Sequence, residues 1–182
     1  MADSPYDRLP TVPSFGLHSA DVADGQRLPL TAHSAIFGFP GGADTSPQLS
    51  WSGFPAQTQS FVVTMFDPDA PTPSGFWHWV VADIPADVTS LPAGAGDGDT
   101  ALPAGAFHLP NDARAPRYVG AAPPPGTGRH RYLIAVHAID APSVVDLGVQ
   151  RDGTPAALSY FTLAKTLARA VIEPWADADS SD

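Results

Sequence analysis

The sequence predicts a mainly β protein, an antiparallel sandwich with one helix near the C-terminus. Three observations carry this prediction. The chain contains 16 glycines and 21 prolines among 182 residues, which suits a fold with many turns. Its hydrophobic fraction of 43% and charged fraction of 15% are the reverse of what a disordered chain shows. Apolar runs of strand length recur between the turn-rich segments.

Three runs have the composition of strands: residues 60–66, 76–84 and 131–139. Both alternating faces of the first run are apolar, so we expect a central strand that is covered on both sides. Proline and glycine cluster between the runs, where turns are expected. The sequence lacks helical segments between these strands, which disfavours a doubly wound α/β fold.

One helix is expected after Thr154. This threonine can cap the helix, and Pro155 suits its first position. Beyond them, apolar residues recur at steps of three and four, namely Leu158, Phe161, Ala164, Leu167 and Val171. The helix should end before Pro174, because the residue before a proline disfavours helical backbone. It would pack on one face or edge of the sandwich.

Length and composition indicate one domain over residues 1–182, with a core of about residues 15–175 and flexible tails. The absence of cysteine excludes disulfides, thiolate nucleophiles and cysteine-based metal sites. A formal net charge of −10 disfavours nucleic acid and anionic lipid surfaces as partners. The sequence has no apolar leader and no run of about 18 apolar residues. A cytoplasmic protein that is not embedded in a membrane is therefore expected.

Asp67 and Asp69 follow the first strand within the motif Asp-Pro-Asp-Ala-Pro. If the extended geometry continues, both carboxylates fall on the same side. There they could bind a metal ion, act as acid and base, or orient a histidine. The same motif is also typical of an Asp/Pro turn, in which aspartate side chains accept hydrogen bonds from backbone amides.

His78 lies within the second strand run, and His130 lies at the start of the third. Alternation places His78 on the same face as Phe76 and Val80. A lone strand histidine is more often a hydrogen-bonded core residue than a ligand. Two of them with two strand-end aspartates can form one polar group, in which an aspartate fixes the tautomer of a histidine and raises its pKa. Such a group favours a phosphate or carboxylate, or alternatively a metal held by two histidines and one carboxylate.

The other histidines are interpreted as ordinary turn or strand residues: His18, His33, His108 and His137. The sequence contains no nucleophile elbow, no phosphate-binding P-loop and no dinucleotide-binding fingerprint. No cofactor is therefore expected.

Several of these residues occur in an order that resembles the phosphatidylethanolamine-binding protein family, in particular its bacterial Raf kinase inhibitor-like (YbhB/YbcL) branch. The resemblance covers about residues 15–171. The motifs that carry it are Asp67-Pro-Asp-Ala-Pro71, Trp77-His78-Trp79-Val80-Val81, Tyr118-Val-Gly120, Pro123-Pro124 and Gly128-Arg-His130-Arg-Tyr132.

The resemblance implies a sandwich built on a large central antiparallel sheet, with a small surface pocket for phosphate-like anions. By motif position, the ligand-binding residues would be Asp67, Asp69, His78 and His130, with Ala122, Pro123 and Pro124 at the rim. It also implies a cis peptide bond before Pro71.

Two positions depart from the family pattern. Ala122 stands where relatives commonly have glycine. Its Cβ disfavours a positive φ at this position and the close approach of a ligand to the backbone. Bacterial relatives tend to carry Gly-x-Tyr near the C-terminus, and this chain has Glu173, Pro174 and Trp175 in that region. A tyrosine hydroxyl that often contributes to the pocket is therefore missing from this segment.

Three functions from different classes follow. The first is a non-catalytic binding protein for a phosphate-bearing or carboxylate-bearing small molecule, such as a phospholipid headgroup. The second is a regulatory inhibitor of a kinase or serine protease that docks through the pocket rim. The third is a hydrolase in which a pocket histidine serves as general base. The family resemblance also suggests a homodimer.

Overall fold

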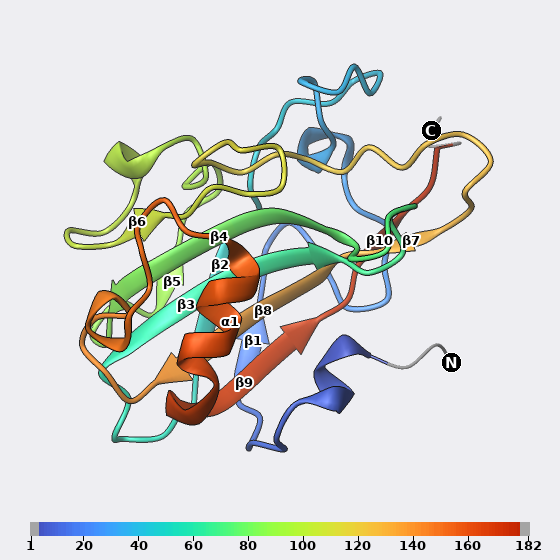
Figure 1. The fold of residues 1–182 in the computed structure, drawn as a ribbon. Coiled ribbons are helices and arrows are strands. Elements are labelled where there is room, and N and C mark those ends of the chain that lie inside the picture. Colours follow the sequence, from blue (N-terminus) through green and yellow to red (C-terminus); the bar gives the residue numbers. More distant parts are fainter. Residues whose placement is uncertain (1–3, 179–182) are drawn as a thin grey trace.

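The computed structural model describes residues 4–178. Its centre is a five-stranded antiparallel sheet with the strand order β6, β4, β3, β8, β9 (Figure 1). The strands are β6 (Phe107–His108), β4 (Phe76–Pro85), β3 (Ser60–Asp67), β8 (Leu133–Ile139) and β9 (Thr166–Ile172). Every residue of β3, the middle strand, is buried. The prediction of a central strand that is covered on both sides is confirmed.

A second sheet covers one face of the central sheet. It consists of three short antiparallel strands, β1 (Gly16–His18), β2 (Leu49–Ser52) and β5 (Ser90–Leu91). Side chains from both sheets share the larger apolar core, in which the ring of Trp51 lies 5.4 Å from that of Phe61. Two sheets with their apolar faces in contact form the predicted sandwich.

The helix α1 (Pro155–Thr162) lies across the opposite face of the central sheet (Figure 1). Thr154 caps it as predicted, because its Oγ1 accepts the N–H of Ala157 over 3.2 Å. Leu158 is buried in a second, smaller apolar cluster between the helix and the sheet. The predicted start of the helix and its place on one face are confirmed.

The predicted continuation of this helix toward Pro174 is wrong. One turn of 3-10 helix, Leu163–Lys165, follows α1 and leads directly into β9. In β9 the buried residues alternate, with Ala168, Ala170 and Ile172 facing the core. This period of two, together with the ladder that β9 forms with β8, outweighs the steps of three and four that suggested a helix.

The third predicted strand run is split into two strands. Its first residue, Arg131, belongs with His130 to β7 (His130–Arg131), which pairs with β10 (Trp175–Ala176) rather than with the central sheet. Tyr132 separates β7 from β8, and its N–H donates to the Pro174 carbonyl over 2.8 Å. The remaining 3-10 helices are Pro5–Arg8, Leu30–Ala32, Asp99–Ala101 and Val145–Leu147.

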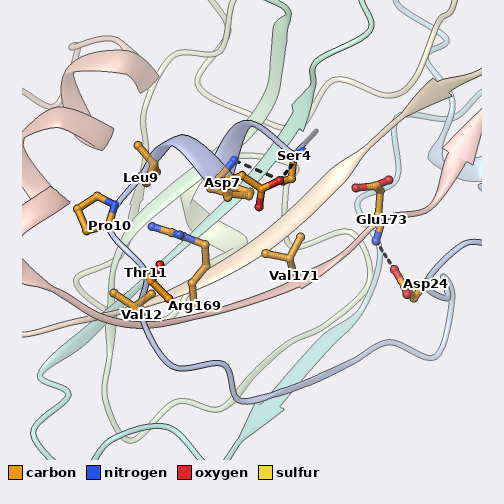
Figure 2. A pocket seen from close by; sticks show the side chains of 11 residues that line it. Ser4, Asp7, Leu9, Pro10, Thr11, Val12, Asp24, Arg169, Val171 and Glu173 are labelled. Atoms are coloured by element: carbon orange, nitrogen blue, oxygen red, sulfur yellow. Dashed lines mark hydrogen bonds between the residues drawn. The ribbon is translucent and has the colours of Figure 1, made fainter. Parts of the chain in front are cut away.

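Of the two tails expected to be flexible, residues 1–3 and 179–182 lie outside the described residues. Residues 4–13 pack along β9, where the N–H of Arg169 donates to the Pro13 carbonyl over 3.0 Å. A hollow of about 480 Å³ remains between this segment and β9, with Arg169 and Glu173 toward its two ends (Figure 2). No helix within residues 4–178 is long and apolar enough to cross a membrane.

Candidate functional site

A cavity of about 140 Å³ lies beside the end of β3, next to β4 and β7. Five of the seven residues proposed from the sequence line it: Asp67, His78, Ala122, Pro124 and His130. Residues from four separate parts of the chain therefore meet here. Asp69 and Pro123 do not belong to the lining.

Asp67 and His130 form a buried hydrogen-bonded pair in this cavity. Nδ1–H of His130 donates to Oδ2 of Asp67 over 2.8 Å, and both side chains are at most 4% exposed. The other carboxylate oxygen, Oδ1, accepts the N–H of Asp69 over 2.8 Å. Both oxygens of Asp67 are thus engaged within the protein, and the aspartate fixes a proton on Nδ1 of the imidazole.

The second ring nitrogen of His130 is also held by the protein. Nε2 lies 2.8 Å from Oγ1 of Thr127, and the hydroxyl of Thr127 donates to the Pro124 carbonyl over 2.7 Å. Oγ1 of Thr127 therefore lies between the Pro124 carbonyl and Nε2 of His130. His130 is therefore oriented from both sides, and neither of its nitrogens is left for a ligand.

His78 offers the imidazole nitrogen that is available to the cavity. Its Nδ1–H donates to the Val119 carbonyl over 2.8 Å, which leaves Nε2 on the side that lines the cavity. Burial lowers the pKa of His78 below its ordinary value, so the ring is neutral at pH 7 and Nε2 carries a lone pair. A bound anion would favour the protonated ring, because an opposite charge at close range raises the pKa of a histidine.

A β-bulge in β4 sets the direction of His78. The register of β4 against β3 shifts at this residue, so His78 is the extra residue of the strand. The rings of Phe76 and His78 lie 4.8 Å apart and share a face, as predicted. The predicted shared face with Val80 is wrong, because the bulge reverses the alternation and Val80 packs in the cluster beneath α1.

Two polar cavity residues were not proposed from the sequence, Tyr132 and Thr72, and the Thr72 hydroxyl donates to the Gly75 carbonyl. Tyr132 is the one whose hydroxyl has no hydrogen-bond partner among residues 4–178, and its side chain is fully buried. Burial raises the pKa of Tyr132 well above its ordinary value, so the hydroxyl remains a donor. Spacing could have found it, because Tyr132 follows His130 by two residues and an extended chain places such residues on the same side.

Asp69 is directed away from the cavity. Oδ2 of Asp69 accepts the backbone N–H and Nε–H of Arg131 at 2.9 and 2.7 Å, and Oδ1 accepts a second guanidinium N–H at 2.8 Å. This bidentate pair lowers the pKa of Asp69 below its usual range. The expected placement of Asp67 and Asp69 on one side required extended backbone, but β3 ends at Asp67 and a turn follows.

The rim of the cavity contains Ala122 and Pro124, whereas Pro123 lines an adjoining groove. Ala122 does not have a positive φ, so its Cβ in place of the family's glycine causes no backbone strain. The cis bond implied before Pro71 is wrong, because the peptide bond there is trans. The turn around Pro71 closes instead through a hydrogen bond from the Thr72 N–H to the Ala70 carbonyl.

Trp175 does not take the place of the family's C-terminal tyrosine in the cavity lining. Its Nε1–H donates to the Gly25 carbonyl over 3.1 Å. The guanidinium carbons of Arg27 and Arg129 lie over its ring, 5.1 and 3.6 Å from the ring centre. This tryptophan therefore anchors the C-terminal segment through cation–π contacts. A tyrosine still lines the cavity, because Tyr132 is among its residues.

Within the described residues, no three His, Asp or Glu side chains are arranged to hold a metal ion. The chemistry that the cavity offers is hydrogen bonding. Tyr132 contributes a hydroxyl donor, His78 contributes a nitrogen that can gain a proton, and the rest of the wall is largely apolar, from residues such as Phe37, Pro71 and Phe76. Such a site suits a small group with acceptor oxygens.

Comparisons with known proteins agree with this fold. The profile of the family described as Phosphatidylethanolamine-binding protein matches residues 18–174. UPF0098 protein YbhB from Escherichia coli K12 is 49% identical over 126 residues, which are 68% of this chain and 77% of YbhB. UPF0098 protein YbcL from the same strain is 41% identical over 162 residues, 88% of this chain and 86% of YbcL.

The crystal structure of E. coli YbcL, described as a new member of the mammalian PEBP family, superposes with a TM-score of 0.83 at 40% identity. The match covers 90% of this chain and 98% of that one. A relative from Mycobacterium tuberculosis H37Rv, 29% identical over 162 residues (89% of this chain and 73% of the relative), is named Putative lipoprotein LppC, and the cytoplasmic location expected for this chain stays a prediction. Because sequence and fold agree over most of its length, this chain belongs to the phosphatidylethanolamine-binding protein family.

Proposed function

We propose that this protein is a non-catalytic binding protein whose cavity holds the anionic group of a small molecule, such as a phosphate or the phosphate of a phospholipid headgroup. The observation that carries this proposal is the hydroxyl of Tyr132, a buried donor without a partner in the described residues, on a side chain that lines the cavity. An unpaired buried donor costs about 1–3 kcal/mol, which an acceptor oxygen of a ligand would recover.

The charges around the cavity support an anion rather than a cation. Asp67 is the carboxylate of the lining, and its oxygens already accept hydrogen bonds from His130 and from the backbone of Asp69. Because each oxygen already accepts a hydrogen bond within the protein, less of the carboxylate is left to hold a ligand cation. An anion would find the hydroxyl of Tyr132 and the protonated form of His78, which together can outweigh the net charge of −10 locally.

The bonding of His130 supports binding without catalysis. A general base must accept the proton of the hydroxyl that it activates. Here both ring nitrogens of His130 have protein partners, Asp67 at Nδ1 and Thr127 at Nε2, so neither nitrogen is free to take a proton from a ligand. His130 therefore acts as an orienting residue. A protein target for the rim and a homodimer both stay predictions.

Isothermal titration with inorganic phosphate and phosphorylethanolamine tests the proposal. We expect Tyr132→Phe to weaken binding by about tenfold or more, because a hydrogen bond to a charged group contributes about 1.5–3 kcal/mol. The same variant should unfold at an equal or higher denaturant concentration, since the hydroxyl has no partner in the unliganded protein.

Tyr118→Phe is the matched control. Tyr118 is equally buried, but its hydroxyl donates to the Ala32 carbonyl over 2.7 Å and lies outside the cavity lining. This variant should lose stability and keep its affinity for phosphate. Unchanged binding by Tyr132→Phe, or no heat of binding for either ligand with the wild-type protein, would refute the anion cavity.

A further inference from the structure

The cavity continues into a larger apolar groove. The groove has a volume of about 510 Å³ and shares Phe37, Ala122 and Pro124 with the lining of the cavity. Phe37 stands at the junction, because its ring lies 6.2 Å from that of Phe76, a cavity residue, while 51% of its surface is exposed. A ligand held in the cavity would therefore have its remaining atoms directed along this groove.

The groove walls lack polar side chains. All lining residues are Phe, Pro, Ala or Gly, and one wall is the run Pro123–Pro125. Opposite this run lie Phe37, Phe39 and Pro40, with Gly38 between the phenylalanines. We refer to this feature, lined by residues 37–40, 122–125 and 178, as the proline groove.

The backbone of the proline groove also offers few hydrogen-bond donors. Its four prolines have no N–H. The N–H of Phe37 donates to Oγ of Ser34, that of Phe39 donates to the Ser34 carbonyl, and that of Gly38 donates to the Ala35 carbonyl. A peptide laid in this groove would leave its own carbonyl groups without donors, at a cost for each buried group. A hydrocarbon chain has no such requirement.

We propose that the proline groove binds the alkyl chain of a single-chain amphiphile whose anionic group occupies the cavity. This inference rests on the proposed anion cavity and adds a second subsite to it. A free, monomeric amphiphile fits better than a lipid within an anionic bilayer, because the net charge of −10 repels such a surface. The groove is one continuous hollow, which suits one chain.

A series of alkyl phosphates tests the groove. Methyl, butyl, hexyl and octyl phosphate, each below its micelle-forming concentration, are titrated into the protein at pH 7 in a calorimeter. Burial of each methylene is expected to tighten binding about fourfold until the groove is filled. Methyl phosphate reports on the cavity alone, so the two proposals are measured separately.

Phe39→Ser and Pro125→Ser alter the proline groove but not the cavity lining. We expect each variant to show a smaller increase in affinity for every added methylene. Its affinity for methyl phosphate should stay within about twofold of the wild type. Pro125 is exposed, so its replacement keeps the test available if loss of the Phe39 contact with His33 unfolds the protein. Tyr160→Ser is the control, because Tyr160 is an exposed aromatic residue on α1 outside the groove.

The possible outcomes separate the two proposals. Equal affinity for all four alkyl phosphates would overturn the proposal that the proline groove binds the alkyl chain. The proposal of an anion cavity would stand. An increase in affinity per methylene that persists in both groove variants would also overturn the groove proposal, because the alkyl chain would then bind elsewhere. Binding to vesicles that contain anionic lipid, without any gain along the monomeric series, would overturn the choice of occupant. Failure of every phosphate to bind would refute the cavity itself.

Discussion

His130 and Asp67 are separated by 63 positions in the sequence, yet Nδ1 of His130 lies 2.8 Å from Oδ2 of Asp67 in a buried environment. Asp67 is the last residue of β3, and His130 is the first of β7. The pair joins the central sheet to the two-stranded ribbon of β7 and β10. The same contact that shapes the cavity therefore also fastens the C-terminal ribbon to the core.

We predict that Asp67→Asn lowers the free energy of unfolding by about 2–4 kcal/mol at pH 7. The carboxylate of Asp67 is a buried acceptor of two hydrogen bonds, and its loss leaves the buried donors of His130 and Asp69 poorly satisfied. Urea denaturation followed by tryptophan fluorescence measures the loss. Asp69→Asn serves as the comparison, because the Asp69–Arg131 pair is partly exposed and such pairs contribute about 1 kcal/mol or less. Equal losses of stability in the two variants would contradict the larger contribution expected from the buried carboxylate of Asp67.

We predict that anion binding weakens as pH rises. In the unliganded protein burial lowers the pKa of His78, so the ring is neutral at pH 7. An anion favours the protonated ring, so the pKa of His78 is higher in the complex than in the free protein. Binding takes up a proton between these two pKa values, and affinity falls as pH rises through that window. Sulfate is the suitable probe because it does not titrate between pH 5.5 and 8. The dissociation constant should rise by up to tenfold per pH unit over part of this range.

His78→Gln is the control for this pH dependence. Glutamine can keep a hydrogen bond to the Val119 carbonyl but cannot take up a proton. The variant should bind sulfate weakly at every pH, with a flat profile. A wild-type profile that is also flat would show that His78 does not bear the charge that holds the anion.

The main strands could be predicted from the sequence because each carries apolar residues in a pattern that only a covered strand satisfies. Residues 166–172 could not, since Leu167 and Val171 fit a helical spacing while Ala168, Ala170 and Ile172 fit a strand. The ladder with β8 decides between the two patterns. That ladder is a long-range contact, which a local pattern cannot reveal.

The candidate site was predictable to the extent that motif order identified Asp67, His78 and His130. The bonding of each side chain was not predictable. Asp69 turns to Arg131 because β3 ends two residues earlier, and the end of a strand is poorly marked in sequence. The bulge that aims His78 at the cavity depends on the register between β3 and β4, which the sequence of β4 alone does not specify.

Close packing at Gly120 gives a further prediction. A Cβ at Gly120 would lie 2.3 Å from the carbonyl carbon of His33, which is backbone and cannot move aside. We expect Gly120→Ala to lower the free energy of unfolding by about 3 kcal/mol and to displace the Val119 carbonyl that holds His78. Thermal unfolding and phosphate titration together measure both effects.

Gly126→Ala is the comparison for Gly120→Ala. Gly126 has a φ of 81°, but a Cβ there would meet no atom within 4 Å. Its cost should therefore be limited to about 1–2 kcal/mol of backbone strain. A larger loss for Gly126→Ala than for Gly120→Ala would contradict the steric argument.

Acid stability provides the last prediction, and it concerns His137 on β8. Burial, reinforced by the charge of Arg169, lowers the pKa of His137 to about 3. Nδ1 of this ring accepts the Nε–H of Arg169 over 3.2 Å, and Nε2 lies 3.3 Å from Oγ1 of Thr64, so the neutral ring is the form that fits. Protonation would place a second positive charge against the guanidinium.

The sign of the effect follows from the two pKa values. Below pH 6.5 the unfolded chain protonates His137, whereas the folded protein does not until about pH 3. Stability conferred by the neutral ring is therefore complete above pH 6.5 and declines between pH 6.5 and 3, by about 1.4 kcal/mol per pH unit at most. His137→Gln removes this contribution, so the stability advantage of the wild type over the variant should shrink steadily from pH 7 to pH 4 in urea denaturation. His18→Gln, on the exposed side of β1, is the matched histidine replacement on the surface. An advantage that stays constant with pH would mean that His137 is protonated in the folded state, and that the contact with Arg169 does not fix the neutral ring.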